Sequence, residues 1–247
     1  MTGELRWLEP EWPAPPGVRV LTTLRTGGVS AGPYASLNLA AHVGDRPEAV
    51  AENRNRLQAA AGLPGEPLWL EQVHGVDVLV HEGRMPAERG ADASVAFERG
   101  RVCVVMTADC LPVVLADRAG TRVGVAHAGW RGLLAGVLEA TVARLGCKPQ
   151  DLRAWLGPAI GAAAFEVGGE VREAYARRSA ILTGAFALNS RGRYQADIYG
   201  LARTVLAEAG VISVYGAGWC THADANRFFS YRRDGKTGRM ATLAWLA

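Results

Sequence analysis

Apolar and polar positions follow two different periods along this chain. Short apolar runs that end in glycine or polar residues predict buried strands. These runs lie at 18–24, 76–80, 102–106, 113–115, 123–126, 154–156, 211–215 and 240–246. Longer stretches with apolar residues on one face predict amphipathic helices at 47–61, 133–145, 170–178 and 198–209. Residues 180–193 have no clear period and are expected to be mostly loop, and 228–239 is expected to be an exposed turn between strands.

Strands and helices alternate irregularly, with short connections, rather than in a regular strand–helix–strand repeat. This order predicts an α+β fold, in which mixed β-sheets are flanked by helices. A chain of 247 residues can bury one substantial core, and no internal repeat or dividing linker is present. We therefore expect one catalytic domain over 18–247, preceded by an irregular Pro- and Trp-rich arm over 1–17.

Composition narrows the class of protein. A hydrophobic content of 49% with 21% charged residues is typical of a globular protein in water. No apolar run approaches the roughly 20 residues of a membrane span, and the first residues lack a signal-peptide pattern, so we expect a cytoplasmic protein without a membrane partner. The net charge is only +3 and the arginines are scattered, so no nucleic-acid partner is expected, and a monomer is favoured.

The candidate chemistry lies at the ends of predicted strands. Cys110 follows the run 102–106, His127 follows 123–126, and His74 lies on a turn between two apolar segments. One thiolate and two imidazoles are a preferred donor set for zinc, and three protein ligands leave a fourth position open for water or substrate. The chain has four cysteines but no Cys-x-x-Cys pair, which favours reduced thiols over disulfides.

The same residues also permit other interpretations. Cys110 could instead be a nucleophile, with His127 or His74 as its base and Asp109 or Asp92 orienting that base. A non-catalytic protein with structural zinc would need a fourth protein ligand, for which Cys220 and His222 are the candidates. The glycine-rich loop at 25–33 is either a phosphate-binding loop or an irregular connection. These residue patterns alone do not separate the alternatives.

Six motifs together resemble the YfiH/laccase-domain family, which is unrelated to the multicopper oxidases. They are Ser-Leu-Asn-Leu with His-Val-Gly-Asp, Gln-Val-His-Gly, Thr-Ala-Asp-Cys-Leu-Pro-Val, His-Ala-Gly-Trp-Arg-Gly, Leu-Gly-Pro-Ala-Ile and Phe-Phe-Ser-Tyr-Arg-Arg-Asp, and the resemblance spans residues 18–246. It implies a YfiH-like single domain and a zinc site whose ligands map onto His74, Cys110 and His127.

The resemblance also implies an activity. Members are described as purine nucleoside phosphorylases, acting on adenosine, inosine, guanosine and methylthioadenosine with phosphate as co-substrate, and as adenosine deaminases. Catalysis is then expected from Cys110, His74 and His127, together with Asp109. The candidate substrate contacts are Asn38, Arg54 and Arg131. The two arginines are candidates because a guanidinium offers a planar fork of donors to phosphate.

Two further activities remain as alternatives. A cysteine amide hydrolase that edits peptidoglycan precursors, a role also attached to bacterial relatives, would use Cys110 as its nucleophile. A copper-dependent phenol oxidase is disfavoured, because one soft site without further clustered histidines cannot build a multicopper centre.

Overall fold

The computed structural model describes residues 5–84 and 86–247. Residues 1–4 of the expected N-terminal arm lie outside the described residues. Within the rest of that arm, strand β1 (Trp7–Leu8) pairs antiparallel with β2 (Val18–Thr23). In the described part of the chain, no helix is both long enough and apolar enough to span a membrane.

The remaining elements alternate irregularly, as the sequence predicts. The helices are α1 (Pro47–Ala60), α2 (Trp130–Ala135), α3 (Val137–Leu145), α4 (Gly169–Arg178), α5 (Ile198–Glu208) and α6 (Tyr231–Asp234). The strands are β3 (Val78–Val80), β4 (Ala93–Ala96), β5 (Cys103–Thr107), β6 (Leu111–Asp117), β7 (Val123–Ala128), β8 (Leu152–Leu156), β9 (Glu166–Val167), β10 (Phe186–Leu188), β11 (Tyr194–Ala196), β12 (Ser213–Gly216) and β13 (Met240–Leu246). Short 3₁₀ helices lie at Gly32–Tyr34, Pro149–Asp151, Ala162–Ala164 and Ala180–Ala185.

The strands form three sheets. The largest has the order β12-β8-β6-β7-β4-β3, and it is mixed because β12–β8 and β3–β4 are parallel pairs while the others are antiparallel. A second sheet, β1-β2-β13-β5, is antiparallel, and a small third sheet has the order β10-β11-β9. The α+β fold of mixed sheets flanked by helices is therefore confirmed.

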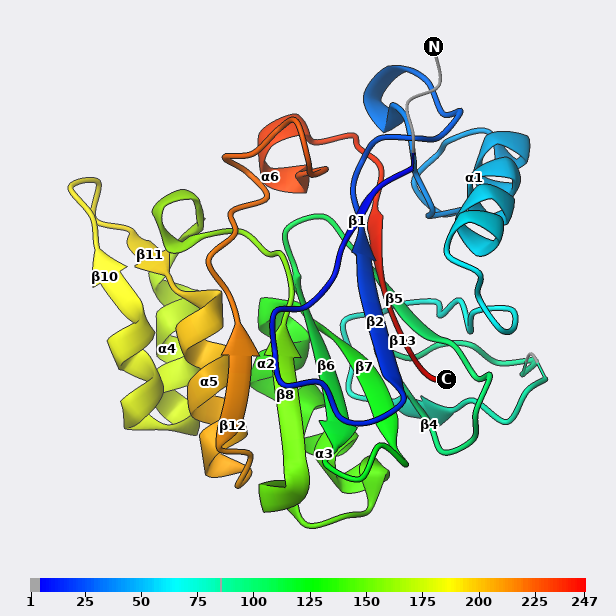
Figure 1. Ribbon diagram of the computed structural model, residues 1–247. Helices are drawn as coiled ribbons and strands as arrows, with labels where there is room; N and C mark the ends of the chain where they lie inside the picture. The colour runs from blue at the N-terminus through cyan, green and yellow to red at the C-terminus, as the bar shows by residue number, and fades with distance from the viewer. Residues whose placement is uncertain (1–4, 85) are drawn as a thin grey trace.

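The two large sheets pack face to face, with helices on their outer faces. Along β6, Leu111, Val113 and Leu115 pack with residues of α3 and α5, whereas Val114 and Ala116 pack against the four-stranded sheet. This alternation is the period of two that a strand buried on both faces requires. Leu57 of α1 packs on the other face of the four-stranded sheet. Figure 1 shows α1 on one side of the molecule and α4 and α5 on the other.

Three local predictions are wrong. The helix expected over 133–145 is two helices, because Gly136 has φ = 109° and breaks it into α2 and α3. The stretch 180–193, expected to be mostly loop, contains a 3₁₀ helix and β10. The stretch 228–239 is not simply an exposed turn, since Phe228 and Phe229 are fully buried and α6 follows them.

Candidate metal centre

Strand register brings the cysteine and one histidine to the same edge of the six-stranded sheet. Cys110 immediately precedes β6, whose first residue, Leu111, lies opposite Ala128 at the end of β7. His127 is the neighbour of Ala128 on β7 and is almost fully buried. Because β6 and β7 are antiparallel, the start of one strand meets the end of the other. Rigid strand ends thus fix both side chains, as a ligand site requires.

A single carboxylate holds the second histidine beside the first. Asp92 directly precedes β4 and is fully buried. Its carboxylate accepts hydrogen bonds from the backbone N–H groups of Val73, His74 and Gly75 at 3.1, 2.9 and 2.6 Å. It also accepts one from His127 Nδ1 at 2.8 Å. Asp92 therefore fixes the turn that carries His74 and orients the ring of His127 at the same time.

The three side chains form a compact cluster of donor atoms. One ligand atom from each of His74, Cys110 and His127 lies within 4.8 Å of the other two. The two imidazole rings stand edge to face with centroids 4.8 Å apart, and Cys110 Sγ lies 3.9 Å from His74 Nε2. Since Nδ1 of His127 is bound to Asp92, its Nε2 is left for a ligand, which is how metal-binding histidines are held in proteins.

The electrostatics of the cluster favour a thiolate. Burial alone would raise the pKa of the Cys110 thiol, but the charge of His127 and hydrogen bonds from both imidazoles outweigh burial, so this pKa is lowered. Burial would likewise lower the pKa of His127, yet Cys110 and Asp92 raise it. The fully buried Cys103 shows the contrast, since burial raises its pKa to about 12. Cys110 is thus the chain's candidate thiolate ligand or nucleophile.

The backbone leaves room for an ion or a reacting atom beside the cluster. A Cβ atom placed on Gly129 would lie 3.0 Å from Cys110 Sγ and 3.0 Å from the ring of His74. Gly129 has φ = −65°, so glycine is not needed there for its conformation. Glycine is therefore needed at this position for the space that it leaves beside the Cys110 thiol. The donor set fits zinc with an open fourth position.

We expect Gly129→Ala to weaken metal binding while leaving the fold intact. The added methyl group would displace Cys110 and His74 from their positions, and a metal site with displaced ligands loses affinity, here by about 10-fold or more. Competitive titration with a chromophoric chelator measures this. Gly169→Ala is the matched control, because a Cβ there meets nothing within 4 Å. Equal affinity in both variants would show that the space at Gly129 is not needed.

Asp109, expected to act in catalysis, has its carboxylate engaged by the protein. Oδ1 accepts from Thr221 Oγ1 at 2.6 Å, while Oδ2 accepts from Ser230 Oγ at 3.0 Å and from the Arg232 N–H at 2.7 Å. The residue has φ = 95°, a left-handed conformation just before Cys110. These contacts tie the turn between β5 and β6 to the C-terminal part of the chain. The geometry thus supports a role for Asp109 in positioning Cys110.

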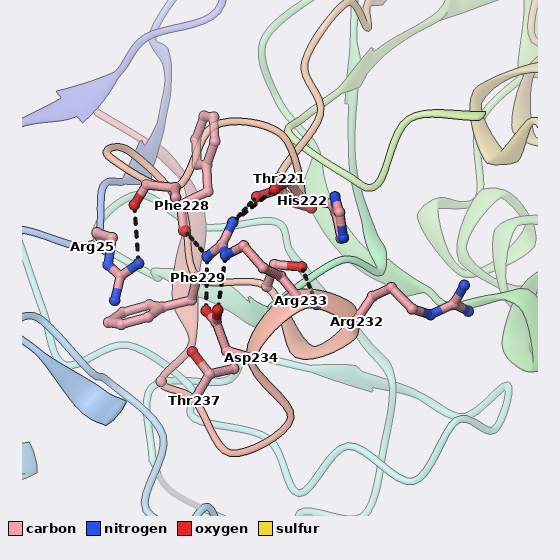
Figure 2. A network of polar contacts seen from close by, with 12 residues as sticks. Arg25, Thr221, His222, Phe228, Phe229, Arg232, Arg233, Asp234 and Thr237 are labelled. Carbon is pink, nitrogen blue, oxygen red and sulfur yellow. Dashed lines mark hydrogen bonds and ion pairs between the residues drawn. The ribbon is translucent and has the colours of Figure 1, made fainter. Parts of the chain in front are cut away.

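That C-terminal part is itself organised by Arg233. Its guanidinium donates to the carbonyl oxygens of Thr221, His222 and Phe228 and forms an ion pair with Asp234 at 2.8 Å. Figure 2 shows the guanidinium between these carbonyl groups and the carboxylate. Ser230 caps α6 by accepting from the Arg233 N–H. The segment that carries α6 is therefore held in place by side-chain contacts rather than by a sheet.

A cavity of about 490 Å³ opens beside the cluster. This volume is within the range of small-molecule sites. Its wall includes the His74, Cys110 and His127 side chains, apolar and aromatic groups, and three arginines. The other lining residues are His42, Gln72, Met106, Thr107, Ala108, Asp109, Trp130, Arg131, Ile160, Phe165, Ile198, Tyr231, Arg232 and Arg239.

Of the three expected substrate contacts, only Arg131 lines the cavity. It is exposed, and its guanidinium lies 4.4 Å from the centroid of the Trp130 ring. Arg54 instead stacks on Trp69 at 3.9 Å and donates twice to the Leu39 carbonyl oxygen.

Asn38 is fully buried away from the cavity. Its side chain bonds to the backbone of Ala40, to Asp45 and to the Arg239 N–H. Asn38 and Arg54 therefore shape the loop that carries His42, and the structure brings neither side chain to the cavity wall.

Several polar residues of the wall were not among the candidates from the sequence, and they include His42, Thr107 and Arg239. His42 and Thr107 lie in motifs that carry the family resemblance, whereas Arg239 lies five residues after the last motif. In the sequence they are marked only by neighbouring glycine and acidic residues. Such neighbours do not distinguish a residue of a cavity wall from an ordinary turn residue. The pairing of β5 with β13 is what brings Thr107 and Arg239 together, since Thr107 lies opposite Met240.

The candidate fourth ligands do not join the cluster. Among the described residues, the group that could hold a metal comprises His74, Cys110 and His127 without Cys220 or His222. Cys220 Sγ instead accepts the N–H of Gly161 at 3.2 Å. Three protein ligands and an adjacent cavity are the pattern of a catalytic metal site rather than a structural one.

Comparison with known proteins identifies the family of this chain. Residues 19–247 match the family described as multi-copper polyphenol oxidoreductase laccase. The chain is 56% identical over 237 residues to purine nucleoside phosphorylase YfiH of Escherichia coli, covering 96% of this chain and 97% of that one. It is 55% identical over 241 residues to a purine nucleoside phosphorylase of Pseudomonas aeruginosa, covering 97% and 98%.

Solved structures show the same fold. A Neisseria meningitidis protein superposes with a TM-score of 0.91 at 50% identity, covering 97% of this chain and 98% of that one. YlmD of Geobacillus stearothermophilus superposes with a TM-score of 0.89 at 30% identity, covering 97% and 96%. The resemblance drawn from the six motifs is thus confirmed: the chain belongs to the YfiH/laccase-domain family, whose relatives include proteins named purine nucleoside phosphorylases.

Proposed function

We propose that this protein is a zinc-dependent purine nucleoside phosphorylase that acts on adenosine, inosine, guanosine and methylthioadenosine and also deaminates adenosine. The observation that carries the proposal is the placement of the His74, Cys110 and His127 cluster in the wall of a cavity of about 490 Å³. The names of the close relatives support the same class of reaction.

The cavity wall suits both parts of a nucleoside. Trp130, Phe165 and Tyr231 supply aromatic rings against which a purine can stack, and Ile160 adds an apolar contact. Arginine side chains on the same wall supply donors for oxygen atoms. A few cationic groups in a mostly apolar wall are typical of a small-molecule site.

Phosphorolysis exchanges one bond at the ribose for another. An oxygen of phosphate forms a bond to C1′ as the C1′–N9 bond breaks. The electron pair of the C1′–N9 bond leaves with the purine, and the purine takes up a proton. The products are ribose 1-phosphate and the free base. Positive charge develops on the ribose and negative charge on the leaving base, so correctly placed donors and a fixed phosphate lower the barrier.

The protein's residues divide this work. His74, Cys110 and His127 would hold zinc, with Asp92 orienting both histidines. When bound, zinc supplies a Lewis acid for an oxygen ligand and lowers the pKa of a water. Asp109 keeps Cys110 in place through its contacts to Thr221 and Ser230. Zinc is favoured over copper because the cluster provides one thiolate and two imidazoles, without the further histidines of a multicopper centre.

Product analysis tests the proposal. Zinc-loaded protein is incubated with each of the four nucleosides, beginning with adenosine, with and without phosphate, and the products are separated by chromatography. We expect adenine and ribose 1-phosphate that depend on phosphate, and inosine that forms without it. If a zinc-loaded, folded protein turns over none of the four nucleosides, the proposal fails.

A cysteine amide hydrolase is the second candidate, favoured by one observation. Cys110, His127 and Asp92 form a chain in which the carboxylate orients the imidazole and the imidazole lowers the pKa of the thiol, the arrangement of a cysteine nucleophile with its base. This function predicts hydrolysis of peptidoglycan-precursor amides by the chelator-treated protein, lost on alkylation of Cys110. Activity that requires metal argues against it.

A further inference from the structure

Among the three arginines that line the cavity, Arg239 differs from the others in what it contacts. Arg232 is exposed and donates to the carbonyl oxygens of Ala164 and Glu166, and Arg131 is exposed beside Trp130. Arg239 is half-buried, and its Nη1 donates to the carbonyl oxygens of Thr237 and Gly238 at 2.9 and 3.1 Å. These two bonds fix the guanidinium and use only one of its three nitrogens.

Apart from the Tyr231 ring, whose centroid lies 5.8 Å from Cζ, the rest of the Arg239 guanidinium has no partner in the described part of the chain. Neither Nε nor Nη2 donates a hydrogen bond, and no carboxylate forms an ion pair with this arginine within 4.0 Å. Burial lowers the pKa of Arg239, whereas Cys110 and Asp109 raise it, which places the group close to the metal ligands. A fixed, partly desolvated cation with free donors is suited to an anion.

A second unpaired group lies beside it. Thr107 is the last residue of β5 and is only 2% exposed, and it lines the cavity. Its Oγ1 has no hydrogen-bond partner in the described structure. Buried hydroxyl groups nearly always have a partner, so an unpaired one on a residue that lines a cavity is a candidate contact for a ligand. Because Thr107 lies opposite Met240, the residue after Arg239, both unpaired groups are at the same end of the β5–β13 pair.

His42 completes this wall. Its side chain lines the same cavity, and burial, followed by the charges of Arg239 and Arg54, keeps the pKa of its imidazole below the ordinary value. A neutral imidazole can donate one N–H to an anion. Asp109 is the carboxylate on the cavity wall, and its oxygen atoms are occupied by Thr221, Ser230 and the Arg232 N–H.

We infer that Arg239, Thr107 and His42 form the subsite for the phosphate co-substrate, next to Cys110. The inference rests on the proposed phosphorolysis, and it assigns this step to Arg239 rather than to Arg54 or Arg131. A tetrahedral oxyanion offers an acceptor to each of these three side chains. The phosphate would then be fixed on the wall formed by β5 and β13, with the purine against the aromatic wall.

Steady-state kinetics with two varied substrates test the assignment. In Arg239→Gln we expect the KM for phosphate to rise about 30-fold or more while the KM for the nucleoside changes less than about 3-fold, since a bidentate contact to phosphate is lost. Thr107→Val keeps the shape of the side chain and should raise the KM for phosphate about 10-fold. Arg227→Gln is the control, because Arg227 pairs with Asp224 and does not line the cavity.

Direct binding separates this inference from the proposed function. Calorimetric titration of the zinc-loaded protein with inorganic phosphate needs no turnover. Binding by the wild type that is lost in Arg239→Gln supports the subsite, even if no nucleoside is cleaved and the proposed function fails. Phosphorolysis with an unchanged KM for phosphate in Arg239→Gln overturns the subsite alone. A rise in that KM in Arg131→Gln but not in Arg239→Gln overturns it in favour of Arg131.

Discussion

Cys110→Ala will lose its bound metal and at least about 10³-fold in kcat/KM for nucleoside phosphorolysis. Cys110 supplies the one thiolate of the cluster, between two imidazoles that lie within 4.8 Å. Loss of a metal that stabilises charge by several kcal/mol corresponds to this change in rate, since each 1.36 kcal/mol is tenfold. Metal content by mass spectrometry and kcat/KM on the same sample measure both effects.

The control for this substitution is another partly exposed thiol. Cys147 lies outside the cavity, and Cys147→Ala should retain the metal and the activity of the parent protein. Cys110→Ser separates ligand chemistry from shape, because it keeps the volume but replaces a soft sulfur with a hard oxygen. Retention of full metal content by Cys110→Ala would show that the cluster is not the metal site.

Asp92→Asn will lower metal affinity 10- to 100-fold and destabilise the metal-free protein by on the order of 3 kcal/mol. An amide cannot accept hydrogen bonds from His74, Val73, Gly75 and His127 as the carboxylate does, because its NH₂ group is itself a donor. Urea unfolding of the chelator-treated protein measures the second effect. Asp77→Asn is the control, because Asp77 is exposed and lies just after the turn at 73–75 that Asp92 holds.

The difference in stability between Asp92→Asn and the wild type will shrink in acid. Burial would raise the pKa of Asp92, but hydrogen bonds from His127, Gly75 and Val73 outweigh burial and lower it. A carboxyl group with a lowered folded-state pKa stabilises the fold above its unfolded pKa, which is about 3.9. This contribution is lost as the pH falls through the folded-state pKa. A difference that stayed constant below about pH 4 would show that the charge of Asp92 is not what stabilises the turn.

The hydrophobic pattern predicted the interior strands of the sheets because a strand buried on both faces is a short, continuous apolar run. The runs around β5, β6 and β7 were found, together with the polar residues at their ends, since short apolar strands bounded by glycine have few alternative interpretations. The break at Gly136 was missed because one glycine in an amphipathic pattern is compatible with a continuous helix. Phe228 and Phe229 were assigned to a turn because charged residues and glycines surround them.

The sequence predicted those site residues whose type alone indicates their chemistry. A thiol and two imidazoles in quoted motifs point to a metal whatever the fold, so His74, Cys110 and His127 could be named in advance. Arginines carry no such mark. Arg54, on α1, stacks on Trp69, whereas Arg239, just before β13, lines the cavity. The position of Arg239 depends on the pairing of β13 with the distant strand β5, which local sequence does not encode.

The position of β13 has a consequence for how this protein reaches its folded state. This strand lies between β2 and β5, and the Thr242 hydroxyl bonds to the Thr22 hydroxyl at 2.8 Å, although 220 residues separate them in the chain. Pairings between such distant segments make folding slow, because a large loop must close first. The contacts of Asp109 with Ser230 and Arg232 wait on the same closure. Until then the turn that carries Cys110 lacks these contacts, and the newly made chain is open to thiol oxidation at the residue that the proposed metal site needs.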